Sequence, residues 1–227
     1  MNLFSKQFLL QTVVVVALGG LFCSPGDAGP FIQVEGGWAR PFTMSHIGFE
    51  YASQGAATND DLTLHSAAAV GGKIGYHFET APWLGVNVEG LYTTPHLKQQ
   101  TTAIHSLKGT QATTAYTVGG SYEHIWTGGL NLTLAYPGER WQPYVEGGPA
   151  FFSANQGGMA TLRPQIGLNA ESGLRYRITA HWVVSVAYKF QQAALILTDH
   201  SGPNGSLNGL SSHYQNQFVL GGVGYTF

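Results

Sequence analysis

Eight charged residues occupy equivalent positions in stretches of the chain where polar and apolar residues alternate. Four are acidic and four are basic: Glu35, Glu89, Glu146, Glu171, Lys73, Arg175, Arg177 and Lys189. Opposite charges on one face can compensate one another as ion pairs, whereas charges of one sign would favour an ion pathway. We therefore expect these residues to form a closed, ion-paired interior. The alternative is that several of them lie near strand ends in water.

Nine histidines offer a second kind of chemistry, because the imidazole ring serves both as a metal ligand and as an acid–base group. Six of them lie in or beside long polar segments: His46, His65, His96, His105, His200 and His213. No two histidines stand at a tight ligand spacing such as HxH or HExxH. We expect solvated histidines and predict no metal and no other cofactor, with a loose metal site on the loops left open.

The elements that carry the charged residues read as strands. Eight stretches alternate with a period of two, which sends successive side chains to opposite faces. They cover residues 31–42, 67–78, 83–92, 128–137, 141–152, 163–178, 182–190 and 213–227. In residues 83–92, Val86 and Val88 oppose Asn87 and Glu89. The pattern predicts an all-β chain of about eight antiparallel strands, each with one apolar and one polar face.

The connections between these stretches alternate between short and long. The short ones, residues 79–82, 137–140 and 179–181, contain turn-forming residues. The long, polar ones cover residues 43–66, 93–122, 153–162 and 191–212. This alternation is typical of membrane barrels and not of an immunoglobulin-like sandwich. Residues 116–125 could extend the fourth strand or belong to the second long connection.

The composition favours the same class. Charged residues make up 10% of the 227 residues, against about a quarter in ordinary soluble domains, and 31 residues are glycine. Low charge with abundant glycine suits a barrel that shows alternate residues to lipid and to a polar interior. The net charge of −2 provides no basic surface, so we predict no nucleic-acid partner.

The first 28 residues have the features of a cleaved secretory signal peptide. Lys6 precedes an apolar run that is too short to span a membrane, and Gly26 and Ala28 precede the expected cleavage before Gly29. The one cysteine of the chain, Cys23, falls within this segment. We therefore expect a mature domain of residues 29–227 without thiol chemistry.

The last stretch and the tryptophans point to a membrane. Four outward-facing side chains of residues 213–227 resemble the assembly signal that the barrel-assembly machinery reads on outer-membrane β-barrels: Val219, Val223, Tyr225 and Phe227. Five tryptophans near predicted strand ends are candidates for the aromatic girdles found at membrane interfaces: Trp38, Trp83, Trp126, Trp141 and Trp182.

The chain from about residue 29 to residue 227 resembles the small outer-membrane β-barrel family typified by OmpA- and OmpX-like proteins. The resemblance is carried by GLNLTLAYPGERWQPYVEGGPAFF (residues 129–152), AYKF (187–190) and LSSHYQNQFVLGGVGYTF (210–227). It implies a closed antiparallel transmembrane β-barrel of the Gram-negative outer membrane, with short periplasmic turns and long extracellular loops. It also implies a monomer surrounded by lipid and lipopolysaccharide, and assembly by the barrel-assembly machinery.

The function expected from these features is a structural or surface-interaction role through the long loops, with the lumen plugged by ion pairs. A narrow channel or a carrier of small apolar ligands is the first alternative, since about eight strands leave room for side chains or one small ligand. A lipid A-modifying hydrolase is the second. Asp199, His200 and Ser201 supply its residue types, but neighbours on an extended chain point apart, and SSHYQN (211–216) has the wrong order. We therefore predict no enzymatic activity.

Overall fold

The computed structural model describes residues 28–51, 54–58, 62–96, 98–106, 113–118, 123–156, 159–161, 163–199 and 207–227. All regular elements in these ranges are β-strands. Among the described residues, no helix has the length and apolar character that crossing a membrane requires. The expected signal peptide lies outside the described residues except for Ala28.

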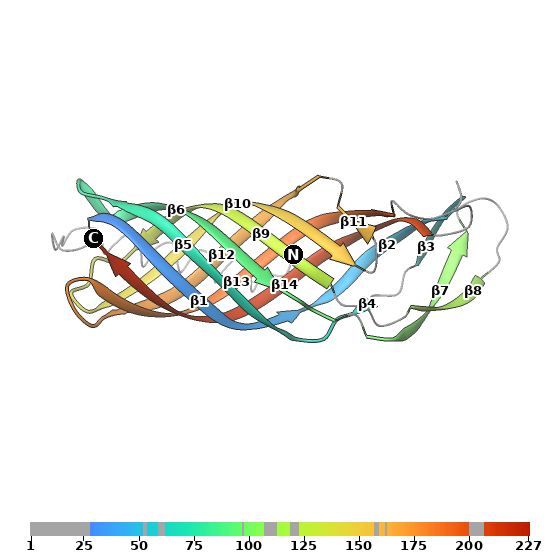
Figure 1. Ribbon diagram of the computed structural model, residues 1–227, viewed down its shortest axis with the longest axis horizontal. Coiled ribbons are helices and arrows are strands. Elements are labelled where there is room, and N and C mark those ends of the chain that lie inside the picture. Colours follow the sequence, from blue (N-terminus) through green and yellow to red (C-terminus); the bar gives the residue numbers. More distant parts are fainter. Residues whose placement is uncertain are drawn as a thin grey trace, which may run out of the picture.

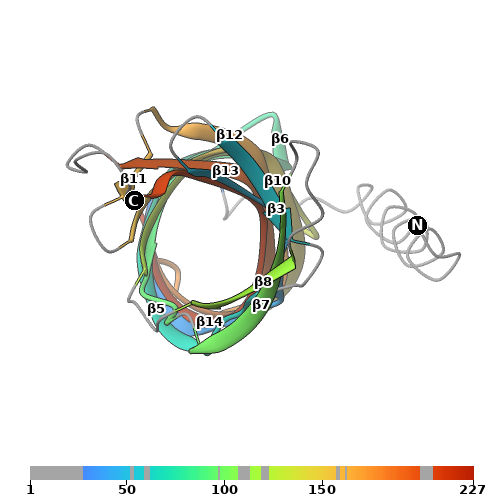
Figure 2. The ribbon, with the colours of Figure 1, turned by 90° about the vertical axis from the view of Figure 1, so that its right-hand side faces the viewer.

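Eight strands form the wall of a closed barrel (Figures 1 and 2). In order around the ring they are β1 (Gly29–Pro41), β5 (Ala67–Phe78), β6 (Ala81–Thr93), β9 (Glu123–Ala135), β10 (Trp141–Gln156), β12 (Gln165–Arg177), β13 (Trp182–Asp199) and β14 (Leu207–Thr226). Every neighbouring pair is antiparallel, and β14 pairs with both β13 and β1, which closes the ring. The predicted antiparallel barrel of about eight strands is confirmed.

The long connections contain more regular structure than the sequence analysis expected. β2 (Thr43–Tyr51), β3 (Gln54–Thr58), β4 (Leu62–Thr63), β7 (Gln100–Ser106), β8 (Thr113–Val118) and β11 (Met159–Ala160) all fall in segments expected to be loops. In Figure 1, β2, β3, β7 and β8 lie at the end of the barrel far from the C-terminus. We call this the loop end, and the opposite end, with the three short connections, the turn end.

The expected loop 191–212 was wrong for most of its length. β13 continues to Asp199 and β14 begins at Leu207, and the two strands stay paired up to Thr198 opposite Gly209. The alternation of buried and exposed side chains continues through this region, where Leu195 is 1% exposed and Ile196 is 53% exposed. The open question about residues 116–125 also has an answer, since β8 ends at Val118 and β9 begins at Glu123.

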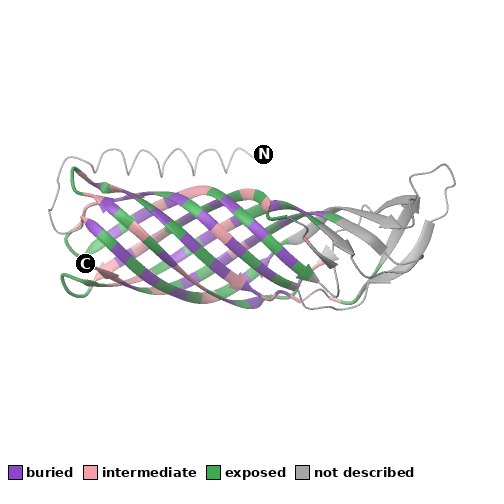
Figure 3. Cartoon of the chain, turned by 45° about the horizontal axis from the view of Figure 1, so that its top comes forward, coloured by how far each residue is buried: buried purple, intermediate pink, exposed green. Residues whose placement is uncertain are grey.

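Buried and exposed residues alternate along the strands of the wall (Figure 3), and the exposed large side chains are apolar while many of the buried ones are polar. On β1, Val34 is 63% exposed on the outside while Glu35 is 3% exposed on the inside. The closed ladder leaves none of these eight strands with an unpaired edge, so the backbone polar groups are satisfied within the sheet. An apolar outer surface on a closed wall suits a surrounding of lipid.

The five tryptophans lie on the outer face in two groups. Trp83, Trp141 and Trp182 lie at or near the first residue of their strands, at the turn end. Trp38 and Trp126 lie on β1 and β9 toward the loop end. All five side chains are 38–60% exposed. The two groups lie toward opposite ends of the wall, and their role as an interfacial girdle stays a prediction.

Candidate functional site

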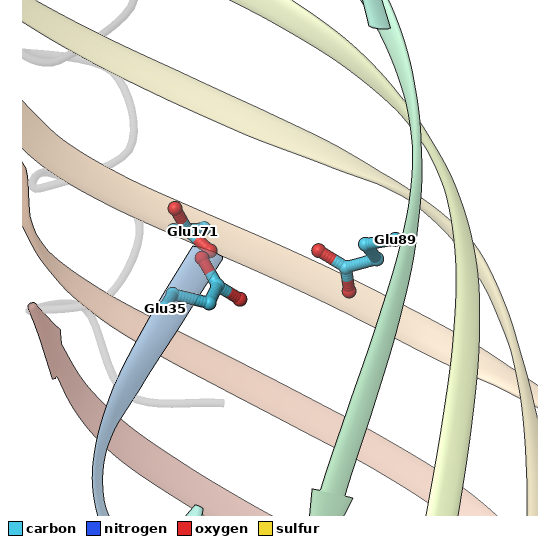
Figure 4. Close-up of side chains that lie close together, drawn as sticks. All are labelled: Glu35, Glu89 and Glu171. Atoms are coloured by element: carbon cyan, nitrogen blue, oxygen red, sulfur yellow. The ribbon is translucent and has the colours of Figure 1, made fainter. Parts of the chain in front are cut away.

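Six of the eight predicted charged residues meet inside the barrel, and we call this cluster the charged layer. Its members come from six different strands of the wall: Glu35 (β1), Lys73 (β5), Glu89 (β6), Glu146 (β10), Glu171 (β12) and Lys189 (β13). All six side chains are at most 2% exposed. Figure 4 shows three of the carboxylates, Glu35, Glu89 and Glu171, directed toward one another across the lumen.

Lys73 is surrounded by carboxylates. Its Nζ atom donates to Glu146 at 2.5 Å and to Glu171 at 2.6 Å. It also lies 3.5 Å from an oxygen of Glu35 and 3.9 Å from one of Glu89. One ammonium group therefore links five strands of the ring.

Lys189 approaches the same carboxylates from β13. Its Nζ atom lies 2.5 Å from Glu89, 2.9 Å from Glu171 and 3.7 Å from Glu35. These three carboxylates are shared between the two lysines, so the charges form one connected network and not isolated pairs. The 2.5 Å contact from Lys189 to Glu89 is a charge-assisted hydrogen bond, which is the strong class.

Uncharged polar side chains complete the network around its margin. Asn87 donates to Glu146 at 3.2 Å, and Asn169 donates to both Glu89 and Asn131. Thr133 reaches Glu146, and the hydroxyl group of Tyr144 donates to Glu171 at 2.6 Å. The sequence analysis gave these residues no role. Their inward position could have been predicted from the period of two. Tyr144, for example, lies two residues before Glu146 on the same strand and therefore on the same face.

Three carboxylates of the charged layer have the spacing of a cation site. Glu35, Glu89 and Glu171 each offer an oxygen within 4.8 Å of the others, and these three form the one such group among the described residues. Hard divalent cations prefer such oxygen ligands. Here the ammonium groups of Lys73 and Lys189 already contact all three carboxylates, so this arrangement is better described as an internal salt than as a metal site.

The two arginines do not join the charged layer. Arg175 stacks on the ring of Tyr144, with Cζ 4.2 Å from the ring centroid, and its Nη1 lies 3.2 Å from His77 Nε2. Arg177 is half-buried at the end of β12, toward the turn end. At roughly 3.3 Å per residue, positions four and six residues beyond Glu171 lie about 13 and 20 Å along the strand. The prediction that the two arginines share a strand face with Glu171 was therefore right. Residues on one face can nevertheless lie at different heights along the barrel axis, and these arginines lie too far from Glu171 to join the charged layer.

An apolar cluster lines one side of the lumen, on the loop side of the charged layer. It consists of Ala39, Ala69, Leu91, Phe218 and Leu220, all at most 5% exposed. Ala39 and Ala69 are each four residues from a charged-layer residue, Glu35 on β1 and Lys73 on β5. The cluster comes from β14, β1, β5 and β6 only, and buried polar residues such as Thr127 and Gln191 also lie on the loop side of the charged layer.

The remaining candidate residues lie away from the lumen. Val219, Val223 and Phe227 are 50–70% exposed, and Tyr225 packs edge-to-face against Trp182 and Phe227 with centroids 5.2 Å apart.

The side chains of His46, His105 and His200 lie outside the described residues. His65 and His96 stack with ring centroids 5.9 Å apart, and in the part of the chain that the structure describes no cluster of histidines has metal-ligand spacing.

Comparison with known proteins agrees with this architecture. Residues 14–227 match the family described as "Outer membrane protein beta-barrel domain". The chain is similar in structure to the outer membrane protein OprG from Pseudomonas aeruginosa, with a TM-score of 0.55 and 18% identity over 88% of this chain and 97% of that one. It is also similar to Neisserial surface protein A (TM-score 0.49, 14% identity, 88% and 98% covered) and to Escherichia coli outer membrane protein W (0.45, 17%, 88% and 99%). No curated protein matches the sequence.

Proposed function

The chain belongs to the outer membrane β-barrel domain family, and from that premise we propose that it is a non-enzymatic, non-conducting barrel that serves the membrane or its surface through the loop end. The observation that carries the proposal is the charged layer, in which two buried lysines and four buried carboxylates from six of the eight wall strands meet across the lumen. Ions would have to break these contacts to pass.

The polar network and the apolar cluster reinforce one another as a seal. Asn87, Asn131 and Thr133 extend the hydrogen bonds to β9, so seven of the eight wall strands contribute. On the loop side, the apolar cluster lines the part of the lumen formed by β14, β1, β5 and β6, where wetting is unfavourable. The charged layer is the main obstacle to a steady aqueous path.

The loop end is where we place the interaction surface. β13 and β14 remain paired well beyond the level of the charged layer, and β2, β3 and β7 add strands to that end. Segments held on a rigid barrel are the usual location of binding surfaces. We propose that the exposed elements of the loop end face the cell exterior.

Conductance of the refolded barrel in a planar bilayer tests the proposed function. Wild-type protein should stay closed, and Glu171→Gln should increase open events, because Glu171 contacts both lysines. Glu79→Gln, which removes an exposed carboxylate in a short turn, is the matched control and should stay closed. Steady wild-type conductance that Glu171→Gln leaves unchanged would reject the seal and favour a channel. Heat-modifiable gel migration verifies that each variant has folded.

We also propose that export and assembly use the two chain segments identified in the sequence. Cleavage of residues 1–28 predicts that the mature protein begins at Gly29, which amino-terminal sequencing of the purified membrane form checks. The outward side chains of β14 are available for recognition before the ring closes, since Val219, Val223 and Phe227 point away from the lumen. Phe227→Ala should lower the fraction of protein in the outer membrane, and normal assembly of this variant would contradict the proposed signal.

A further inference from the structure

A hollow lies on the outer face of the wall, toward the loop end, over three neighbouring strands, and we call it the outer hollow. Its volume is about 300 Å³. The ladder between β12 and β13 reaches Gly167 opposite Ala193, whereas the ladder between β13 and β14 continues to Thr198 opposite Gly209. The hollow therefore lies where β13 runs on beyond its pairing with β12. The outward side chains that line it are Ile166, Leu168, Gln192, Ala194, His213 and Gln215.

The outer hollow opens toward the surroundings of the barrel. Ala194 is the smallest of the outward side chains, and it lies directly opposite His213 on β14. All six outward side chains are exposed. On the inward side, Ala193, Leu195 and Tyr214 are at most 6% exposed. Because these inward side chains are buried, a ligand reaches the outer hollow from the membrane side and not from the lumen.

The outer hollow lies about one membrane thickness from the turn end. Gln192 follows Trp182 by ten residues on β13. At about 3.3 Å per residue and a strand tilt of about 40°, ten residues rise about 25 Å along the barrel axis. This rise is about the height of the apolar band of a membrane barrel. With Trp182 at the turn-end interface, Gln192 is at the level of the lipid head groups of the opposite leaflet.

Two glutamines offer polar contacts at this level. Gln192 and Gln215 lie directly opposite each other on β13 and β14. In the part of the chain that the structure describes, neither side-chain amide has a hydrogen-bond partner. Nearer the turn end, by contrast, the hydroxyl group of Tyr188 donates to Gln217 at 2.5 Å. A primary amide has two N–H donors and one carbonyl acceptor, so the two glutamines can bind hydroxyl and amide groups of a ligand.

The remaining lining decides which kind of head group fits. Ile166 is 72% exposed and Leu168 is 59% exposed, and these two form an apolar side on β12. The lining contains no Asp, Glu, Lys or Arg, so no carboxylate, ammonium or guanidinium group there would pair with a charged head group. An apolar side next to uncharged amides fits the junction between an acyl chain and a hydroxyl-bearing head group.

We propose that the outer hollow binds an acylated sugar, with its acyl chain against Ile166 and Leu168 and its hydroxyl and amide groups on Gln192 and Gln215. The occupant to which the proposal commits is the acylated amino sugar of lipopolysaccharide in the surrounding leaflet. The proposal rests on the proposed orientation of the loop end toward the cell exterior. It does not depend on whether the lumen conducts.

NMR of the refolded protein in phosphatidylcholine nanodiscs tests the proposal, with N-octanoylglucosamine as the probe. The methyl group of Ala194 and the side-chain amides of Gln192 and Gln215 report on the outer hollow. The methyl group of Ala68, which is exposed on β5, reports on the outer face elsewhere. We expect a saturable shift of the three reporters in the hollow and none of Ala68. Octylphosphocholine, which has a chain of the same length and a phosphate head group, should give no saturable shift.

Three variants separate the hollow from the rest of the outer face. Ala194→Leu fills the hollow, and binding followed at Gln215 should weaken about tenfold. Gln215→Leu removes one amide, and binding followed at Ala194 should weaken about threefold to tenfold. Ala68→Leu adds the same side chain to the outer face of β5 and should bind like the wild type. Heat-modifiable gel migration verifies folding, and loss of one methyl signal in Ala194→Leu assigns the Ala194 resonance.

Two results would overturn the proposal. The first is a set of reporters that do not saturate with N-octanoylglucosamine or that respond equally to octylphosphocholine. The second is equal weakening of binding by Ala194→Leu and Ala68→Leu, which would mean that the whole outer face and not the hollow takes up the probe. Either result leaves the proposed seal intact, because the seal is decided by conductance of the wild type and Glu171→Gln.

Discussion

The charged layer and the surroundings of Arg175, nearer the turn end, treat buried charge in opposite ways. In the charged layer, Lys73 and Lys189 each contact at least three carboxylates within 4 Å. Arg175 is almost as deeply buried, at 6% exposed, but contacts two aromatic rings and His77. In the first arrangement carboxylates and lysines compensate one another, although Glu35 Oε1 has no hydrogen-bond partner, whereas in the second Nε and Nη2 of Arg175 have none. The contrast indicates that loss of a cation should be more costly in the charged layer than at Arg175.

The largest difference should appear when each region loses its cation. Lys189→Met leaves buried carboxylates uncompensated and should lower the free energy of unfolding by about 3–5 kcal/mol. Arg175→Met leaves no buried carboxylate unpaired among the described residues, and should lower it by only about 1 kcal/mol, for the donor lost to His77. Urea unfolding in lipid vesicles, followed by tryptophan fluorescence, measures both. If Lys189→Met and Arg175→Met lowered the free energy of unfolding equally, the proposed difference between the two regions would be wrong.

The next effect concerns Tyr144, which joins the two regions. Tyr144→Phe removes the 2.6 Å hydrogen bond to Glu171 and keeps the ring face that Arg175 covers. A hydrogen bond to a charged group contributes about 1.5–3 kcal/mol, so we expect a loss of that size in the same urea assay. Tyr76→Phe on the outer face is the control and should unfold like the wild type. A similar loss in both variants would mean that the bond to Glu171 is unimportant.

A smaller effect is expected where the backbone makes room for the same ring. A Cβ atom added at Gly173 would lie 2.7 Å from atoms of the Tyr144 ring, so Gly173→Ala must displace the ring. We expect a loss of about 1–3 kcal/mol, as for other overpacked interiors. At Gly90 an added Cβ atom meets nothing within 4 Å, so Gly90→Ala should not destabilise the barrel. The comparison fails if Gly173→Ala is as stable as Gly90→Ala.

The smallest effect should come from the carboxylate with the longest contacts. Glu35 lies 3.5 Å from Lys73 and 3.7 Å from Lys189, and its Oε1 atom has no hydrogen-bond partner. Because four carboxylates share two lysines, neutralising one of them also relieves repulsion. Glu35→Gln should therefore change the unfolding free energy by less than about 1 kcal/mol. A loss as large as that of Lys189→Met would show that every charge in the layer is equally required.

Much of this architecture is readable from the alternation of residue types. The bounds of β5 and the inward direction of Glu35, Lys73 and Lys189 follow from a period of two. The level at which each side chain lies along the barrel axis does not, because it depends on the stagger between strands, which alternation leaves undetermined. Arg175 was consequently placed on the correct face and in the wrong cluster. The full length of β13 was missed because residues 191–199 (QQAALILTD) do not alternate between polar and apolar types, although burial alternates over residues 191–196.

The charged layer also has a consequence for how the barrel folds. Its contacts join residues 73, 98 and 100 positions apart in the chain, so they form only when distant strands meet. A sheet that has assembled β1, β5 and β6 but lacks β13 holds Glu89 without Lys189, its nearest cation. Such a partial sheet lacks one of the two cations that contact Glu89 in the complete ring. The last strands therefore gain stability from residues synthesised first, which makes folding of the wall cooperative and disfavours incomplete barrels.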